Sequence, residues 1–340
     1  MRIGILTGGG DAPGLNGIIE AATRTLINLG HEALGIRDGF EGIYNRDVVP
    51  LTIDAVRGVH AFAGTFVGTS NRSGTEGREE EFIKAYKELG IDGLIVAGGD
   101  GTFRCLKGLD HDVKLIGVPK TIDNDLPGTD ATFGYDTACS VVSEAVDDLR
   151  TTATAHKRII VVETMGRTAG WIALGGGMAS MADAILIPER PVNLNQFKTF
   201  LKEKHKSQRG IIVVTSEGVT LEEGVERDMD KSGKSVMVHD YGIGQRLAQW
   251  VEKEIDWEAR HIVLGHLQRS HPPTTTDRFL TTAMGIVAAR LADQNQWGQA
   301  AVYKNGQIHP VALESITGEP RNVDPEHRWV KMVQALGIFI

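Results

Sequence analysis

The stretch Gly117-Val118-Pro119-Lys120-Thr121-Ile122-Asp123-Asn124-Asp125 decides which fold and which site we expect of this chain. The mostly apolar run 114–118 predicts a buried strand, and Pro119 should stop its ladder because proline has no N–H to donate. In open α/β sheets, ligands bind at the carboxyl ends of such strands. In an extended chain Thr121, Asp123 and Asp125 point to one side, so one carboxylate could accept a proton while the other helps to hold a metal ion. Asp-Asn-Asp followed by Leu-Pro-Gly is also good turn chemistry, and this stretch alone favours neither interpretation.

Composition limits the classes of protein to which the chain could belong. Its 340 residues, 41% of them hydrophobic, are enough for two domains with their own cores. The net charge of -8 argues against a general nucleic-acid surface. Two cysteines, Cys105 and Cys139, argue against a disulfide framework and favour a reducing interior. No apolar run reaches membrane length, so we expect a cytoplasmic protein without membrane or nucleic-acid partners.

Two glycine-rich turns follow predicted strands in the first third of the chain. Residues 8–14 come after the strand 3–7 and before an amphipathic helix, an arrangement that suits anions because free N–H groups point at the turn. Pro13 stands where the third glycine of a dinucleotide fingerprint belongs, so that class is not indicated. Gly98-Gly99-Asp100-Gly101-Thr102 follows the strand 93–97. Its glycines let a polyphosphate approach the main chain, and Asp100 could hold Mg²⁺. In both places a plain strand–helix turn is the alternative.

The second half of the chain repeats this pattern and predicts a second α/β domain. Strands are expected at 159–162, 184–187, 210–214 and 262–264, with charged residues before or after three of them. Arginines in such positions suit a sugar phosphate, since the guanidinium fork matches phosphate oxygens. Glu217 could accept hydrogen bonds from hydroxyl groups. His266 could contact a hydroxyl or a phosphate group, but a structural role explains it equally well. A Walker A motif is lacking, and the charged stretch 222–235 that imitates one is expected to be an exposed loop.

Together these motifs resemble those of the 6-phosphofructokinases. The matching segments are 9–16 (Gly-Gly-Asp-Ala-Pro-Gly-Leu-Asn), 98–102, 119–125, 165–167 (Met-Gly-Arg) and 265–269 (Gly-His-Leu-Gln-Arg). They keep the family's order and spacing and cover nearly the whole chain. We therefore expect an α/β fold of two doubly wound domains with mostly parallel sheets and an active site in the cleft between them. Residues 1–135 with 268–318 would form the nucleotide or phosphoryl-donor domain, and 136–267 with 319–340 the sugar-phosphate domain.

The resemblance implies Mg²⁺-dependent transfer of a γ-phosphoryl group to the 1-hydroxyl of fructose 6-phosphate. Asp123 would be the base that accepts the hydroxyl proton, Thr121 would touch the transferring phosphoryl group, and Arg167 would stabilise developing charge. Asp100 would bind Mg²⁺, and Asp125 would support the metal or the base. The expected ligands of the donor phosphates are Gly10, Arg72, Gly99, Gly101 and Thr102, with the Lys120 ammonium near the transferred phosphate.

The resemblance also implies a sugar-phosphate site and an oligomer. Met165 and Gly166 would shape the sugar site, and Glu217 would hold fructose hydroxyls. His266 and Arg269 would bind the 6-phosphate. Arg158 and Arg260 match residues that reach in from a neighbouring subunit, which implies a homo-oligomer, either a dimer or a tetramer.

The chain departs from the family's pattern in four respects. ATP-dependent members commonly have glycine at positions 101 and 120, whereas pyrophosphate-dependent members have aspartate and lysine. This chain combines Gly101 with Lys120. We favour ATP, since a carboxylate at 101 would repel an α-phosphate while a lysine at 120 suits either donor. Where the family usually has Arg-Gly-Gly-Ser-Pro, residues 269–273 of this chain read Arg-Ser-His-Pro-Pro. The family's arginine in the small-residue loop, here 64–74, appears as Arg72, displaced by one residue. That loop could equally be a mobile surface loop. Glu20 replaces an effector-binding arginine, which predicts weak or absent control by ADP or phosphoenolpyruvate.

Three alternatives stay open on the sequence. The chain could be a reversible, pyrophosphate-dependent enzyme, or it could use another phosphorylated ketose. A non-catalytic binding subunit is the third, although such a protein would have no need of a base such as Asp123.

Overall fold

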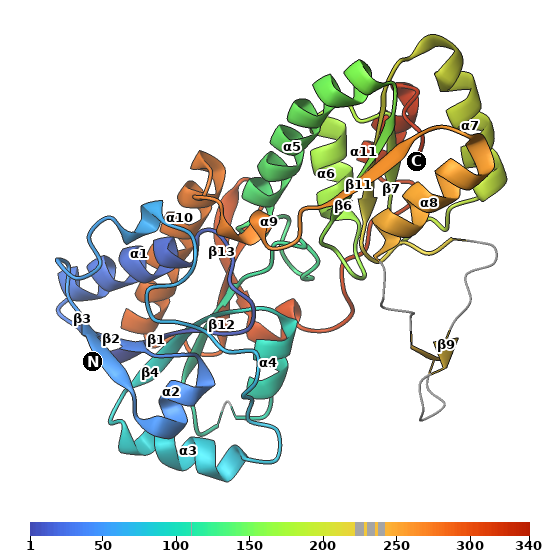
Figure 1. Ribbon diagram of the computed structural model, residues 1–340. Coiled ribbons are helices and arrows are strands. Elements are labelled where there is room, and N and C mark those ends of the chain that lie inside the picture. The colour runs from blue at the N-terminus through green and yellow to red at the C-terminus, as the bar shows by residue number, and fades with distance from the viewer. Residues whose placement is uncertain (110, 222–227, 230–234, 237–241) are drawn as a thin grey trace. The chain divides into compact units, whose positions relative to one another are not determined.

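The computed structural model describes residues 1–109, 111–221, 228–229, 235–236 and 242–340. The chain divides into two compact units, and each takes a segment from the C-terminal part of the sequence (Figure 1). Unit 1 is Met1–Thr137 with Arg269–Arg321, and unit 2 is Ala138–Gln268 with Asn322–Ile340. The expected boundaries 135, 268 and 318 lie near these, while the functional labels given to the two domains stay predictions. Of the loop expected at 222–235, the described residues include only β9 (Asp228–Met229) and the first residue of β10 (Ser235–Val236).

Unit 1 is built on a seven-stranded sheet in the order β13-β12-β5-β4-β1-β2-β3. Only the β12–β13 and β2–β3 pairs are antiparallel. The strands are β1 (Arg2–Thr7), β2 (Glu32–Ile36), β3 (Val48–Leu51), β4 (Gly93–Gly98), β5 (Leu115–Pro119), β12 (Gln299–Lys304) and β13 (Gln307–Ala312). The chain leaves β1 toward β2 on one side and later returns to place β4 on the other. This reversal puts a topological switch point between β1 and β4.

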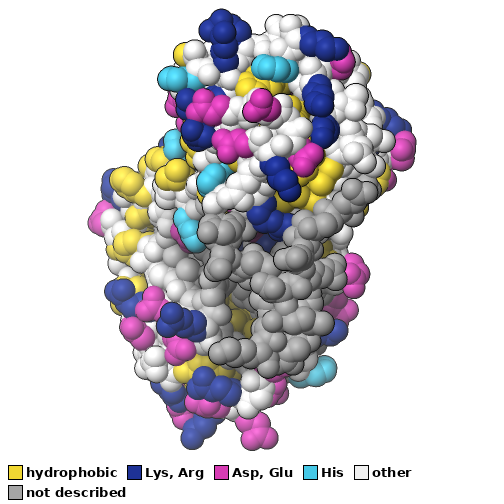
Figure 2. Space-filling model, turned by 45° about the vertical axis from the view of Figure 1, so that its right-hand side comes forward, with side chains coloured by type: hydrophobic (Ala, Val, Ile, Leu, Met, Phe, Trp, Pro, Cys, Tyr) yellow, Lys and Arg dark blue, Asp and Glu magenta, His cyan; other side chains and the backbone are white. Residues whose placement is uncertain are grey.

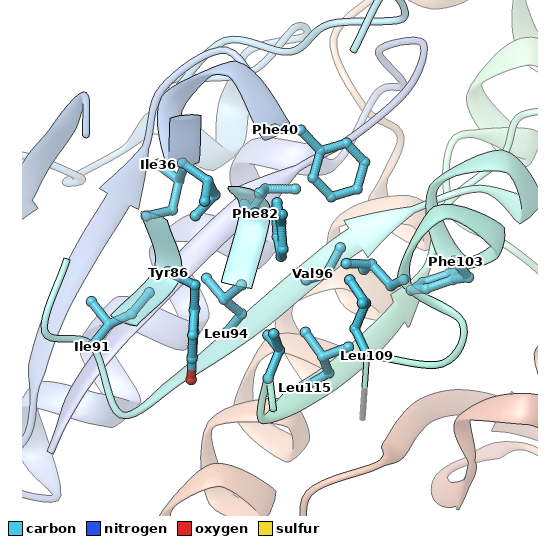
Figure 3. Close-up of a cluster of buried hydrophobic side chains, with 14 of the residues drawn as sticks. Ile36, Phe40, Phe82, Tyr86, Ile91, Leu94, Val96, Phe103, Leu109 and Leu115 are labelled. Carbon is cyan, nitrogen blue, oxygen red and sulfur yellow. The ribbon is translucent and has the colours of Figure 1, made fainter. Parts of the chain in front are cut away.

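Helices cover both faces of this sheet (Figure 1). They are α1 (Leu15–Asn28), α2 (Phe40–Asn45), α3 (Glu79–Glu88), α4 (Asp100–Leu106) and α10 (Thr275–Asp293), with short 3-10 turns at Val59–Ala61 and Leu313–Ile316. On the face of α2, α3 and α4, the buried cluster in Figure 3 gathers Phe82 and Tyr86 of α3 with Leu94 and Val96 of β4. Three glutamates in the first turn of α3 interact favourably with the positive end of the helix dipole. The apolar residues of α3 lie along one side of the helix.

Unit 2 contains a four-stranded parallel sheet in the order β11-β6-β8-β7. The strands are β6 (Ile159–Thr164), β7 (Ala184–Leu186), β8 (Ile211–Ser216) and β11 (Ala259–Val263). Its helices are α5 (Tyr135–His156), which begins in unit 1, α6 (Trp171–Ala179), α7 (Leu194–Ser207), α8 (Ile243–Ile255), the short α9 (Leu267–Ser270), whose last two residues belong to unit 1, and α11 (Arg328–Ala335). Phe197 and Leu201 of α7 and Leu247 and Val251 of α8 pack on one face of this sheet. Because every residue of β6, β7 and β8 is buried and most are aliphatic, the sheet is covered on both faces.

The expected fold class is confirmed, and most predicted strands lie within one to three residues of the observed ones. Strand β5 ends at Pro119, as expected, although Pro119 does not break the pairing with β4. It belongs to β5, opposite Gly98, and the N–H of Lys120 donates to the carbonyl of Gly98 at 2.8 Å. In a parallel sheet, only alternate residues of a strand donate their N–H groups to a given neighbouring strand. Lys120 donates to β4, so the N–H that Pro119 lacks would not have pointed at β4, and the hydrogen bonds between β4 and β5 are intact.

The surface is of mixed charge. On the face that Figure 2 presents, Lys and Arg side chains are interspersed with Asp and Glu rather than gathered in one basic patch. Among the described residues, the helices are too short or too polar to cross a bilayer.

Candidate functional site

Two glycine turns of unit 1 lie side by side at the switch point. The N–H of Gly8, after β1, donates to the carbonyl of Ala97 in β4 at 2.9 Å. Thr102 packs so closely between the turns that a Cβ at Gly8 would lie 2.6 Å from its Cγ2, and one at Gly98 2.5 Å from its Cβ. Real Cβ atoms do not approach other atoms so closely, so both positions require glycine. The result is a stretch of bare main chain at the carboxyl ends of β1 and β4.

A pocket of about 650 Å³ opens beside these turns within unit 1. Its volume is in the range of small-molecule sites. The predicted donor residues Gly10, Arg72, Gly99, Gly101 and Thr102 all line it, as does Lys120. The other lining residues are Gly9, Phe40, Glu41, Ser70, Asn71, Ser73, Gly74, Glu76, Arg78 and Cys105. Among the described residues, a Cβ at Gly101 would meet no atom within 4 Å, so the space beside that glycine is open.

Asp100 and Asp125 are the carboxylates suited to a metal ion. Asp100 is the first residue of α4 and forms an ion pair with Arg104 one turn later. Burial raises the pKa of Asp125, and the negative charge of Asp100 raises it further, so the two carboxylates lie within electrostatic reach. Mg²⁺ prefers such oxygen ligands and commonly completes its shell with substrate phosphates. Among the described residues, clusters of three or more His, Cys, Asp or Glu side chains that could hold a metal are lacking. The pair therefore fits Mg²⁺ if a bound polyphosphate supplies the remaining ligands.

Lys120 lies at the carboxyl end of β5 and is only 4% exposed. Its Nζ donates a hydrogen bond to the carbonyl oxygen of Gly10. Burial lowers the pKa of Lys120 to about 8, and the positive charge of Arg269 contributes to this shift. Asp11, Asp123 and Asp125 oppose the shift. The ammonium group is therefore held against the first glycine turn in a site rich in ionisable groups.

The segment 121–125 is a turn, the second of the two interpretations that the sequence left open, rather than an extended chain. The Thr121 and Asp125 side chains still meet, since burial raises the pKa of Asp125 and a hydrogen bond from the Thr121 side chain opposes that rise. The N–H of Asp123 donates to the Thr121 hydroxyl at 3.1 Å, and Asn124 has a left-handed φ of 54°. The amide oxygen of Asn124 accepts the N–H of Thr132 at 3.0 Å. The local hydrogen bonds of Asp and Asn outweigh strand propensity here.

Arg321 is a part of this turn that the sequence analysis missed. Its guanidinium donates twice to the carbonyl of Asn124, at 2.7 and 3.2 Å, and once to that of Asp130 at 3.0 Å. Its own N–H donates to the carbonyl of Asp125 at 2.6 Å. Nothing local in the sequence marks Arg321, which lies 197 residues beyond Asn124. Arg104, the partner of Asp100, could have been suggested by its spacing of four residues on a helix.

In unit 2, three loops meet at the carboxyl edge of the sheet because β6 lies between β8 and β11. The loop 165–167, Met165-Gly166-Arg167, follows β6, and the Ser216 hydroxyl at the end of β8 donates to the Gly166 carbonyl. Nε of Arg167 lies 3.9 Å from a carboxylate oxygen of Glu217. The Arg167 side chain is 91% exposed, and His266, after β11, is also exposed. The expected sugar-side residues Met165, Gly166, Arg167, Glu217 and His266 thus come from neighbouring strand ends of one sheet.

Arg158 and Arg260 lie elsewhere on unit 2, Arg158 just before β6 and Arg260 on the adjacent strand β11. Both form ion pairs with Glu258, at 3.2 Å from Arg158 and 2.6 Å from Arg260. Arg260 also pairs with Glu252 at 3.0 Å. The two arginines that the resemblance assigns to a neighbouring subunit are therefore held together by one carboxylate.

Arg269 is the expected sugar-side residue that belongs to unit 1. Its Nη1 donates to the carbonyl of Asp11 at 2.5 Å. A Cβ at Gly10 would lie 3.0 Å from this nitrogen. Arg269 thus lies against the first glycine turn, whereas His266 belongs to unit 2.

The chain has two doubly wound α/β units, with glycine turns and charged residues at the carboxyl ends of parallel strands. These features are typical of the class of α/β proteins that bind phosphorylated ligands. Within this class the chain belongs to the phosphofructokinase family, because the family model described as "Phosphofructokinase" matches residues 2–292.

Curated relatives of nearly equal length support this assignment. The chain is 39% identical to "ATP-dependent 6-phosphofructokinase 2" of Clostridium perfringens, covering 99% of this chain and 97% of the relative. It is 40% identical to "ATP-dependent 6-phosphofructokinase 3" of Streptomyces coelicolor, with coverage of 97% and 98%. It is 38% identical to "Pyrophosphate--fructose 6-phosphate 1-phosphotransferase" of the same organism, with coverage of 100% and 99%. Relatives named for either phosphoryl donor are thus about equally similar.

A solved structure shows the same fold. The crystal structure of the pyrophosphate-dependent phosphofructokinase from Marinobacter aquaeolei matches with a TM-score of 0.84. The match covers 100% of this chain and 88% of that chain at 21% identity, so it supports the fold alone.

Proposed function

We propose that this protein is a 6-phosphofructokinase that transfers the γ-phosphoryl group of ATP to the 1-hydroxyl of fructose 6-phosphate, with Mg²⁺. The observation that carries the proposal lies in unit 1. There the paired glycine turns, Lys120 and the carboxylates of residues 100, 123 and 125 all follow the strands β1, β4 and β5. Phosphoryl transfer needs this combination, because it depends on positioning and charge neutralisation more than on covalent chemistry.

In the proposed reaction the sugar's 1-hydroxyl oxygen bonds to the γ-phosphorus while the bond from that phosphorus to the bridging oxygen breaks. The hydroxyl proton passes to the carboxylate of Asp123. Thr121 contacts the transferring group, and Lys120 and Arg167 offset its charge. Asp100, with Asp125 beside it, would hold Mg²⁺, which would supply positive charge to neutralise the donor's phosphate oxygens. ADP and fructose 1,6-bisphosphate are the products.

On the sugar side, Glu217 accepts hydroxyl groups and His266 contacts the 6-phosphate, with Met165 and Gly166 shaping the site. Arg158 and Arg260 contribute to the 6-phosphate site of a neighbouring copy, so the working form is a homo-oligomer. Cys105 and Cys139 are both thiols rather than disulfide-bonded, which agrees with work in the reducing cytoplasm as a glycolytic enzyme.

ATP is the donor that the pocket favours. The pocket continues from the glycine turns to Phe40, Arg78 and Cys105, and the space beside Gly101 is open. A nucleotide uses such room, whereas a pyrophosphate ion needs only the part next to the turns. Pyrophosphate is the second candidate, because Lys120 and the similarity to the Streptomyces coelicolor phosphotransferase favour it. Steady-state assays of each donor with fructose 6-phosphate and with sedoheptulose 7-phosphate distinguish the donors and the sugars.

The variant Asp123→Asn tests the chemistry. Loss of a general base should lower kcat by roughly 10²–10⁴ while the affinity for both substrates changes little. Asp54→Asn is the matched control, since the Asp54 side chain is 87% exposed in unit 1 and forms a surface ion pair with Arg57. Near-normal turnover by Asp123→Asn would remove the proposed base. A wild-type chain that binds ligands without turnover would instead be a binding subunit.

A further inference from the structure

One arginine restrains the turn that carries the proposed base Asp123. The Arg321 guanidinium donates two hydrogen bonds to the carbonyl of Asn124, at 2.7 and 3.2 Å, and one to that of Asp130 at 3.0 Å. The backbone N–H of Arg321 donates to the carbonyl of Asp125 at 2.6 Å. Arg321 therefore fixes the two peptide groups that begin at Asn124 and Asp125, directly after the base.

The other side of the turn is held by its own residues. The N–H of Asp123 donates to the Thr121 hydroxyl at 3.1 Å, and the buried amide oxygen of Asn124 accepts the N–H of Thr132 at 3.0 Å. Asn124 has a left-handed φ of 54°, which is uncommon for a residue other than glycine. Such a conformation persists only where the surrounding structure determines it. Arg321 supplies the charged part of that restraint.

The guanidinium of Arg321 is largely withdrawn from water. Burial lowers its pKa, and the negative charges of Asp130 and Asp125 are among those that oppose the shift. Hydrogen bonds in such an environment are stronger than at the surface, and the planar guanidinium makes them in a fixed geometry. The restraint is therefore one of direction as well as of charge.

The chain beyond Arg321 is fixed as well, within unit 2. Unit 1 ends at Arg321, and two residues later the N–H of the buried Val323 donates to the carboxylate of Glu189 at 2.7 Å. The same carboxylate accepts the N–H of Gly170, the N-cap of α6, at 3.0 and 3.2 Å. Gly170 follows the expected sugar loop, 165–167, by three residues. One end of this short crossing thus holds the turn of the base, and the other end is bound to the helix start that follows the sugar loop.

We infer that Arg321 is a positioning residue for Asp123, and that the crossing 321–323 links the turn of the base to the start of α6. This inference rests on the proposed function, in which Asp123 accepts the hydroxyl proton. Arg321 acts through the backbone of Asn124 and Asp125 rather than by touching a substrate. A misplacement of about 1 Å in a reacting group can cost about 10² in rate.

Steady-state kinetics of full-length variants test the position of the base. Arg321→Gln should lower kcat by about 10- to 100-fold, while KM for fructose 6-phosphate and for the donor stays within about threefold of wild type. Arg321→Lys should recover only a small part of kcat, since an ammonium cannot reproduce the paired bonds to Asn124. In Arg321→Ala, added ethylguanidinium should restore part of kcat.

Arg2→Gln is the matched control. The Arg2 guanidinium also donates to two backbone carbonyls of unit 1, those of Leu89 and Gly90, at 3.4 and 3.3 Å. It lies at the amino end of β1, whereas the glycine turns and the turn of the base follow carboxyl ends of strands. Arg2→Gln should therefore leave kcat unchanged.

Glu189→Ala tests the link from its other end. This variant should lower kcat by about fivefold or more. The double variant with Arg321→Gln should then stay within about twofold of Arg321→Gln alone, because a link that is already broken transmits no further change. Effects on kcat that multiply in the double variant would overturn the link.

A measurement without turnover separates this inference from the proposed function. Hydrogen–deuterium exchange of peptides from 121–132 should be faster in Arg321→Gln than in wild type and in Arg2→Gln. If it is faster while wild type does not phosphorylate the sugar, only the proposed function fails. A normal kcat in Arg321→Gln, or faster exchange throughout unit 1 instead of in 121–132, would overturn the inference. If Arg321→Gln folds poorly, Arg321→Lys gives the same readouts.

Discussion

Lys120 combines full burial with a charge that the proposed chemistry uses. Its pKa is lowered to about 8, first by burial and then by the neighbouring Arg269. As the pH rises through about 8, the ammonium loses its proton and the donor phosphates lose a counter-charge. We expect kcat/KM for the donor to fall above this pH, whereas in Lys120→Met it should be lower at pH 7 and show no such fall. A profile measured from pH 6 to pH 10 checks this, and the same alkaline fall in Lys120→Met would assign it to another group.

At the scale of elements, Asp277 joins the first turns of α5 and α10. Its carboxylate accepts the N–H groups of Gly134 and Thr137, each at 2.9 Å, and the Thr137 hydroxyl at 2.5 Å. Thr274, the N-cap of α10, donates in return to Asp136 at 2.6 Å. The two helix starts are thus capped by each other's side chains.

Burial raises the pKa of Asp277 to about 6 from 3.8. The folded chain therefore binds more protons than the unfolded chain between these values, so stability should fall as the pH rises from about 4 to about 6, by up to about 3 kcal/mol. Melting temperatures across this window, compared with those of Asp277→Asn, measure the effect. In Asp277→Asn, the part of the fall in melting temperature with pH that Asp277 causes should disappear. An unchanged slope would show that other carboxylates cause it.

Strand β11 carries a second test at this scale. It is the edge strand of the unit 2 sheet, and Glu258 just before it pairs with both Arg158 and Arg260. If these arginines bind a neighbour's sugar phosphate, the carboxylate competes with that phosphate. Glu258→Gln should then lower KM for fructose 6-phosphate, by about two- to fivefold for such exposed pairs. Glu252→Gln, which affects Arg260 alone, should have the smaller effect. A raised KM in Glu258→Gln would mean that the carboxylate positions the arginines instead.

The whole molecule depends on assembly if the proposal is right. A sugar site that needs Arg158 and Arg260 from another copy loses activity when the oligomer dissociates, while donor binding by unit 1 persists. Specific activity should therefore fall on dilution at the concentration where sedimentation velocity shows smaller species. A monomer with full activity would contradict the shared site.

The sequence specified strands and glycine turns well because both are local. Runs such as Ile211–Ser216 are apolar and β-branched, and the turns carry glycine where Thr102 packs against the backbone. It left the turn at Asn124 undecided against an extended chain, and it did not indicate the contact of Arg321 with this turn or that of Arg269 with Asp11. These contacts join residues about 200 or more positions apart, and no periodic pattern records them.

Unit 1 is discontinuous in the chain, which has a consequence for biosynthesis. Strand β12 pairs with β5, and α10 packs on α1, yet both follow the main segment of unit 2, residues 138–268, in the sequence. A ribosome that has delivered the first 137 residues has therefore produced a sheet with an unpaired edge and a helix with an uncovered apolar side. That nascent intermediate must stay unassociated until more than 130 further residues have emerged, the 131 from 138 to 268.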